Sequence, residues 1–122
     1  MAYTETHHPT PNTSPGTNER LGVVLHHTGG SFAGALAWLT APHSRVSAHV
    51  LIAEDGQRAL LAPDDAITWH AGRSRWRGRT GCNAFTLGVE FAGDTTRQPL
   101  TQAQVASFLA WYRPRAQQYG WH

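Results

Sequence analysis

The sequence contains no lysine, so all ten of its basic residues are arginines, and with eight acidic residues the formal net charge is only +2. Its single cysteine, Cys82, excludes an internal disulfide and a zinc site built from several cysteines. No apolar run is long enough to span a bilayer, and residues 1–20 lack the apolar segment of a secretory signal peptide. These absences predict a chain that does not span a membrane and is cytoplasmic as synthesised, or is exported by another route.

Several short motifs that identify enzyme classes are also missing. There is no His-Glu-x-x-His, no Gly-x-Ser-x-Gly, no phosphate-binding glycine loop and no Cys-x-x-Cys. The enzyme classes that carry those motifs are therefore unsupported.

What remains is a chain of 122 residues, 40% hydrophobic, which is enough for one domain with one core. Residues 1–20 are polar and predict an irregular N-terminal arm, whereas a helix that begins after Ser31 and a helix that Pro114 kinks or interrupts are both expected further on. The expected strands are 22–27, 46–53, 58–61, 67–70 and 85–92, with a loop at 71–84 and the second helix opened by a capping box at 101–104. This order predicts a mixed α/β fold, a central mixed β-sheet flanked by helices.

Glu90 is the most informative single residue. The alternation of residues 85–92 places its carboxylate on the face opposite Leu87, Val89 and Phe91, next to Gly88, which leaves room above the sheet. A carboxylate in such a place is either paired structurally or kept for acid/base chemistry. The sequence by itself leaves both alternatives open.

Four histidines lie in segments that could meet Glu90: His26, His27, His49 and His70. His26 and His27 alternate along a strand, so only one of them can share the face of Glu90. Each histidine taken singly is more often structural than functional. Together with a carboxylate they suit a zinc site.

Four arginines, residues 73, 75, 77 and 79, alternate through the expected loop. They are either a solvated basic surface or a site for an anionic ligand, because guanidinium groups pair well with carboxylates and phosphates. The small net charge argues against nucleic acid as a partner.

A series of segments resembles the zinc-dependent N-acetylmuramoyl-L-alanine amidases, the superfamily of phage lysozyme-amidases and peptidoglycan recognition proteins. The segments are Ser14–Arg20, Val24–Thr28, Ala35–Leu39, Val46–His49, Asp55-Gly56, Trp69–Gly72, Cys82-Asn83 and Leu87–Glu90. The resemblance implies the fold of that superfamily for residues 21–122. It also implies a hydrolase that cleaves the amide bond between the N-acetylmuramoyl lactyl group and L-alanine in peptidoglycan or muropeptides.

The resemblance also assigns catalytic roles. His26 matches the first ligand of Zn²⁺, the implied cofactor, and Glu90 matches the general base that activates the zinc-bound water. His27 matches a variable position, and we expect it to pack.

Substrate-binding roles follow in the same way. His49, His70 and Asn83 match residues beside the substrate groove, and the Trp69 ring offers apolar surface to the sugar or peptide. Arg75 lies outside the resemblance, and we expect it to bind stem-peptide carboxylates.

The family pattern continues with two further zinc ligands and a lysine after the last helix, whereas this sequence ends at Tyr119-Gly120-Trp121-His122. Two interpretations follow: a truncation of an active amidase, or a degenerate, non-catalytic peptidoglycan-binding module. One protein ligand holds zinc poorly, so the 122-residue chain is predicted to be weakly active or inactive.

Overall fold

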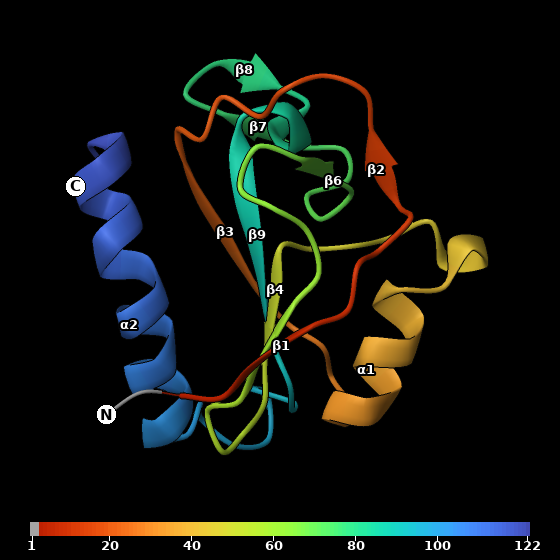
Figure 1. The fold of residues 1–122 in the computed structure, drawn as a ribbon, viewed down its shortest axis with the longest axis vertical. Helices are drawn as coiled ribbons and strands as arrows, with labels where there is room; N and C mark the ends of the chain where they lie inside the picture. Colours follow the sequence, from red (N-terminus) through yellow and green to blue (C-terminus); the bar gives the residue numbers. More distant parts are fainter. Residues whose placement is uncertain (1–2) are drawn as a thin grey trace.

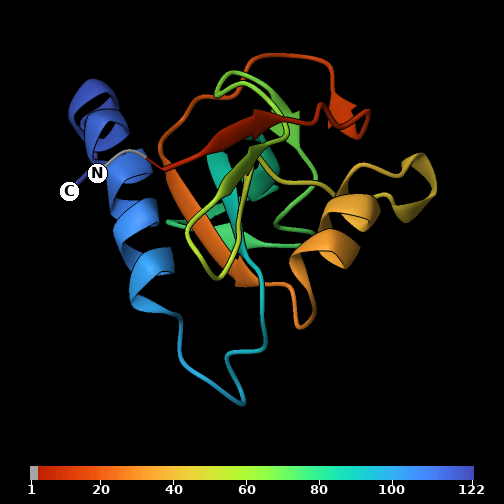
Figure 2. The same ribbon diagram turned by 60° about the horizontal axis from the view of Figure 1, so that its bottom comes forward.

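A mixed five-stranded sheet forms the centre of residues 3–122, the part of the chain that the computed structural model describes. Across the sheet the order is β1 (Glu5–His7), β5 (Arg58–Leu60), β4 (Val50–Ile52), β9 (Thr86–Phe91) and β3 (Gly22–His27). The strands β4, β9 and β3 are parallel, β5 is antiparallel to β4, and β1 is parallel to β5. Helices α1 (Phe32–Leu39) and α2 (Gln102–Tyr119) lie on opposite sides of the sheet (Figures 1 and 2). The predicted mixed α/β fold is therefore confirmed.

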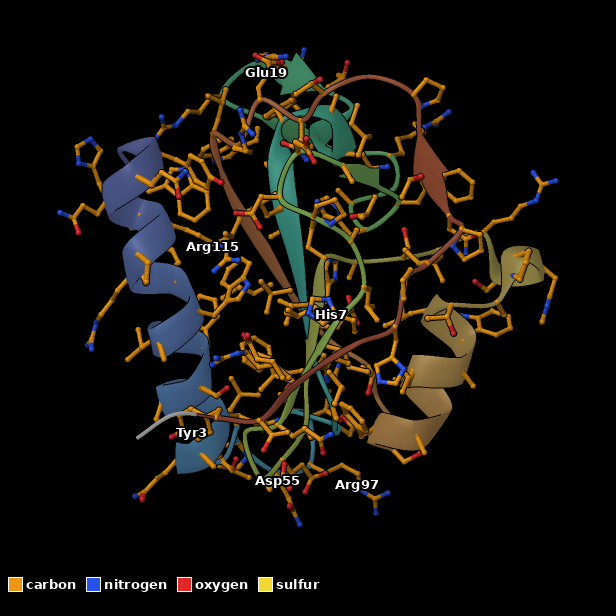
Figure 3. All side chains as sticks on the ribbon, in the orientation of Figure 1. Tyr3, His7, Glu19, Asp55, Arg97 and Arg115 are labelled. Atoms are coloured by element: carbon orange, nitrogen blue, oxygen red, sulfur yellow. The ribbon has the colours of Figure 1, made fainter. Side chains whose placement is uncertain are left out.

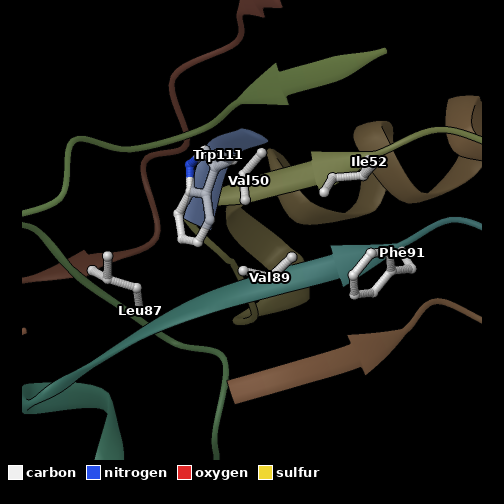
Figure 4. Close-up of a cluster of buried hydrophobic side chains, with 6 residues drawn as sticks. All are labelled: Val50, Ile52, Leu87, Val89, Phe91 and Trp111. Atoms are coloured by element: carbon white, nitrogen blue, oxygen red, sulfur yellow. The ribbon is translucent and has the colours of Figure 1, made fainter. Parts of the chain in front are cut away.

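The face of the sheet that meets α2 carries the larger apolar cluster. Its buried members come from β4, β9 and α2 and are Val50, Ile52, Leu87, Val89, Phe91 and Trp111 (Figure 4). Because side chains alternate along a strand, Gly88 and Glu90 lie on the other face. The capping box between Thr101 and Gln104 opens α2 as the sequence predicts.

The face that meets α1 buries a second cluster: Leu39, Ala48, Leu51, Ala59 and Leu61. The helix begins where the sequence predicts, because the Ser31 hydroxyl accepts a hydrogen bond from the amide of Gly34. A short 3-10 turn, η1 (Pro42–Ser44), follows the helix. This face also contains the candidate site.

The N-terminal segment corrects one expectation, because it is not irregular throughout. Its strand β1 pairs with β5, and the Arg58 guanidinium donates a hydrogen bond of 2.7 Å to the Glu5 carboxylate. A second short strand, β2 (Thr13–Ser14), pairs with β6 (Ile67–Thr68). Both pairings are made to residues more than fifty positions away, so no local pattern could indicate them.

Two further expectations differ from the structure. The strand expected over 46–53 is regular only in β4. Before it, the backbone amides of Ser47 and His49 donate to the carbonyls of Trp69 and Gly88, which belong to different segments. The sequence predicts that the second helix is kinked or interrupted at Pro114; α2 is not interrupted, since it continues to Tyr119, and the kink stays a prediction. Proline lacks the amide hydrogen that would bond to the Ala110 carbonyl, and Ala110 is exposed, so water can satisfy that group.

The expected loop at 71–84 contains a small hairpin, β7 (Arg75–Trp76) and β8 (Arg79–Thr80), and a 3-10 turn, η2 (Cys82–Ala84). Arg77 and Gly78 both have positive φ, 50° and 78°, which is the conformation of a two-residue type I′ turn. Neither helix within residues 3–122 has the length and apolar composition that crossing a bilayer requires.

Candidate active site

A cavity of about 420 Å³ lies between α1 and the sheet. Glu90 lines it from β9, and Trp69 and His70 line it from the segment that follows β6. The other lining residues are His27, Thr28, Gly30, Ser31, Gly34, Ala35, Trp38, Leu39, Val46 and Ser47. The cavity therefore combines one carboxylate with indole and aliphatic surface, a composition typical of a ligand site.

Glu90 is held near the carboxyl end of β9, in register with His26 of the neighbouring strand β3. Paired residues of parallel strands project on the same face, so His26 and not His27 shares the face of Glu90. Burial raises the pKa of the Glu90 carboxyl to about 7. A carboxyl group with such a pKa can exchange a proton with water near neutral pH, as a general base must.

The space above Gly88, predicted to be open, is occupied by the imidazole of His70. A Cβ atom at position 88 would lie 2.4 Å from Cγ of that ring. Only glycine therefore allows His70 to pack this closely against β9. The glycine makes room for His70, which is one wall of the cavity.

Hydrogen bonds fix the proton positions on both buried histidines. The Thr86 hydroxyl donates to the Cys82 carbonyl, so it accepts from Nε2–H of His70 at 2.8 Å. Nδ1 of His70 then accepts from the Thr68 hydroxyl at 2.7 Å. Burial is the main cause that lowers the pKa of His70 to about 3, and the charges of His49 and His26 add to it. His70 is therefore a neutral wall of the cavity with both ring nitrogens already bonded.

His49 does not line this cavity, which corrects the expected groove position. Its side chain is 2% exposed, Nδ1 accepts from the Gly88 amide at 3.0 Å, and Nε2–H donates to the Ala66 carbonyl at 2.8 Å. Burial lowers the pKa of His49 to about 4. The ring supports β9 and the loop of Ala66 from inside the protein.

Asn83 holds the segment that carries His70. Its Oδ1 accepts hydrogen bonds from the amides of His70 at 3.1 Å and Ala71 at 2.7 Å. This contact fixes the backbone beside the cavity, so the structure gives Asn83 a supporting position there. Whether it also touches substrate stays a prediction.

His26 and Arg75 line a smaller neighbouring cavity of about 250 Å³, together with Ser74 and Trp76. The arginines of this loop make different contacts. Arg79 forms a double hydrogen bond with the Glu19 carboxylate at 2.6 and 3.2 Å, at the top of Figure 3 where Glu19 is labelled. Arg77 lies 4.5 Å from the centre of the Trp76 ring. Arg75 has no ion pair among the described residues, so its guanidinium is available to an anion.

His27 differs from its expected packing role. Its ring is exposed, and Nδ1 accepts a hydrogen bond of 2.8 Å from the Thr95 amide, with the Asp94 carboxylate 3.8 Å away. The imidazole therefore anchors the loop that follows β9. His27 also belongs to the lining of the larger cavity, so strand alternation by itself does not place it away from Glu90.

The described residues do not complete a zinc site. Structural and catalytic zinc ions take at least three protein ligands, and no group of three or more histidine, cysteine, aspartate or glutamate side chains within residues 3–122 is placed to hold a metal ion. His26 is one candidate ligand. In this part of the chain, the predicted zinc site is therefore supported by one candidate ligand.

Three residues of the site were not found from the sequence. Thr68 and Thr86 fix the histidine rings, and Trp38, 51% exposed, lines the cavity from α1. The threonines alternate as ordinary strand residues do, so they give no signal. Trp38 gives none either, because single exposed apolar side chains are common on protein surfaces.

The sequence model described as N-acetylmuramoyl-L-alanine amidase matches residues 16–122. The chain belongs to this family, whose members are generally zinc-dependent. It is 48% identical over 54 residues to the 1,6-anhydro-N-acetylmuramyl-L-alanine amidase AmpD of Escherichia coli, a match that covers 44% of this chain and 30% of the enzyme.

Solved structures agree with the family. A selenomethionine derivative of AmpD superposes with a TM-score of 0.81 at 26% identity, over 98% of this chain and 77% of that chain. The amidase AmiD of E. coli, in complex with anhydro-N-acetylmuramic acid-L-Ala-D-gamma-Glu-L-Lys, superposes with a TM-score of 0.73 at 25% identity, over 91% of this chain and 46% of that chain. The chain thus has the amidase fold, while its sequence match spans under a third of AmpD.

Proposed function

We propose that the cavity binds N-acetylmuramoyl-L-alanyl peptides, free or within peptidoglycan, and presents the lactyl amide to Glu90 for hydrolysis. The observation that carries this proposal is the Glu90 carboxyl itself: it lines the cavity, its pKa is raised to about 7, and it lies in register with His26. The substrate class comes from the family of the chain and from the muropeptide bound to AmiD.

Three side chains of the cavity have different roles in the proposed reaction. Glu90 takes the proton of the attacking water and returns it to the departing amine of L-alanine, because its pKa allows both steps near neutral pH. Trp69 offers an apolar ring face to the sugar or the lactyl group. His70, neutral and doubly bonded, excludes water behind the scissile amide without competing for the proton.

Arg75 extends the site toward the peptide. Arg75 lines the same cavity as His26, and its guanidinium can form a bidentate pair with a stem-peptide carboxylate. Arg73 is exposed in the same loop but does not line that cavity, so Arg73→Ala is a matched control for Arg75→Ala. We expect only the Arg75 variant to weaken binding.

A second candidate function, binding without hydrolysis, is favoured by one observation. The described residues offer a single candidate zinc ligand, and no group of three. On this alternative the cavity retains muropeptide affinity, whereas the amide bond stays intact.

One experiment separates the two functions. The chain is incubated with anhydro-N-acetylmuramoyl-L-alanyl-γ-D-glutamyl-L-lysine in ¹⁸O-water, with and without added zinc chloride, and the products are analysed by mass spectrometry. Hydrolysis places one ¹⁸O atom in the lactyl carboxylate and releases a peptide with a free L-alanine amine, and Glu90→Gln should abolish this release. Binding of the intact compound by calorimetry without release identifies the binding module. Absence of both refutes the proposed substrate.

A further inference from the structure

Residues 10–14, which end with β2, touch three separate walls of the cavity. β2 pairs with β6 and lies on the same side of the sheet as α1 (Figure 1). The walls that it touches are the end of α1, residues 46–47 and Trp69, which are otherwise contributed by different parts of the chain. We refer to residues 10–14 as the bridging segment.

The bridging segment first fixes the end of α1. The Thr10 hydroxyl donates a hydrogen bond of 2.7 Å to the Leu39 carbonyl. The Asn12 side-chain amide donates hydrogen bonds of 3.0 Å to the Ala41 carbonyl and 2.9 Å to the Val46 carbonyl. Carbonyls in the last turn of a helix have no donor within the helix. Asn12 is 2% exposed, so water does not compete for these bonds. The distance between α1 and the loop at Val46 is thereby set.

The bridging segment also fixes Trp69 at both its backbone and its ring. The Ser47 hydroxyl donates 2.6 Å to the Asn12 carbonyl and accepts 2.8 Å from the Trp69 amide. The indole Nε1–H of Trp69 donates 2.8 Å to the hydroxyl of Ser14. An indole whose N–H is bonded keeps one ring orientation, and ring orientation decides which surface faces the cavity.

We propose that three side chains of the bridging segment, those of Thr10, Asn12 and Ser14, position the walls of the substrate site, and that Ser14 is the positioning residue for the Trp69 indole. This inference rests on the proposed function, since it needs a muropeptide in the cavity. The sugar or lactyl group then meets a ring that is already oriented, so the binding equilibrium does not bear the cost of ordering it. Ser14 itself does not line the cavity and acts only through Trp69.

The test compares three variants. Ser14→Ala removes the acceptor, Ser14→Thr keeps a hydroxyl in a strand position where threonine is well tolerated, and Thr13→Ala is the matched control, because Thr13 is exposed in the same strand. Affinity for the anhydro-muramoyl tripeptide is measured by calorimetry far below the unfolding temperature. Exchange of the Trp69 indole N–H is followed by ¹⁵N NMR, with the signal assigned by Trp69→Phe.

We expect Ser14→Ala to bind roughly threefold to tenfold more weakly and to exchange its indole N–H faster, while Ser14→Thr restores both and Thr13→Ala changes neither. The inference is overturned if Ser14→Ala keeps wild-type affinity, if its affinity falls without a change at the Trp69 indole, or if Thr13→Ala weakens binding equally. Failure of the wild-type chain to bind overturns the proposed function, and this inference with it.

Discussion

Replacing Gly88 by alanine tests the packing on which the candidate site depends. In an ordinary strand position this change is stabilising by about 0.5–1 kcal/mol, because glycine loses more backbone entropy on folding. At Gly88 the added methyl would lie 2.4 Å from Cγ and 2.5 Å from Cβ of His70. Contacts this short cannot persist, so either the ring or the strand must move.

The His70 ring cannot move cheaply. It is 9% exposed, and the hydroxyls of Thr68 and Thr86 hold its two nitrogens at 2.7 and 2.8 Å. Overpacking of a core costs about 1–3 kcal/mol, and each lost hydrogen bond adds about 1 kcal/mol. We therefore expect Gly88→Ala to reduce the free energy of unfolding by roughly 2–4 kcal/mol.

Urea denaturation at pH 7 measures this change, with an unchanged m-value showing that the same surface unfolds. Gly30→Ala is the matched control, because a Cβ atom there meets nothing within 4 Å. A Gly88→Ala protein as stable as the wild type would refute the reasoning, since it would mean that His70 does not lie against β9.

Three further predictions concern polar groups that are buried or partly buried. His49 has a pKa of about 4 in the folded chain against 6.5 when unfolded, so its contribution, about 3 kcal/mol, is complete above pH 6.5 and is lost as the pH falls toward 4. Because His70 and Glu90 also titrate in this range, the contribution is read from the difference in unfolding free energy between the wild type and His49→Gln; a difference that does not change between pH 4 and 6.5 would contradict it. Glu90 has a pKa raised from 4.5 to about 7, so burial disfavours its charged form. Glu90→Gln should therefore be no more stable than the wild type below pH 4.5 and more stable above pH 7, and its hydrolysis should be abolished. Equal denaturation midpoints of the two proteins at pH 8 would refute the expected difference in stability. Asn18 is fully buried, and its side-chain amide donates hydrogen bonds to the carbonyls of Thr86 at 2.7 Å and Ala66 at 3.1 Å. Asn18→Ala should lower the free energy of unfolding, measured by calorimetry, by roughly 2–4 kcal/mol. A decrease below about 1 kcal/mol would show that water replaces the amide.

Local patterns in the sequence were sufficient for the elements that carry their own signals. The strand at 22–27, the cap at Ser31 and the capping box at Thr101 all lie where the patterns placed them. Alternation also placed Glu90 opposite Leu87 and Val89. These features depend on side-chain periodicity and on hydrogen bonds within a few residues.

Residues 1–20 show where local patterns fail. The strand β1 and the side-chain bonds of Asn12 and Ser14 join positions 29 to 55 residues apart. The polar, proline-rich composition of this segment is the same whether it is irregular or held by such partners. Only the folded chain brings the partners within hydrogen-bonding distance.

The histidines divide in the same way. Their residue type and spacing indicated chemistry near Glu90, and the strand register of His26 with Glu90 agrees. The sequence could not show that Thr68 and Thr86 fix the His70 ring, or that His49 is buried with both nitrogens bonded.

The sequence by itself determined the class of fold, the family resemblance and the face on which Glu90 lies, because these follow from composition, periodicity and motif order. The tertiary structure decided which side chains reach the cavity and which only support it. Solvent exposure and proton positions depend on groups far apart in the chain, and those groups become neighbours only when the sheet is assembled.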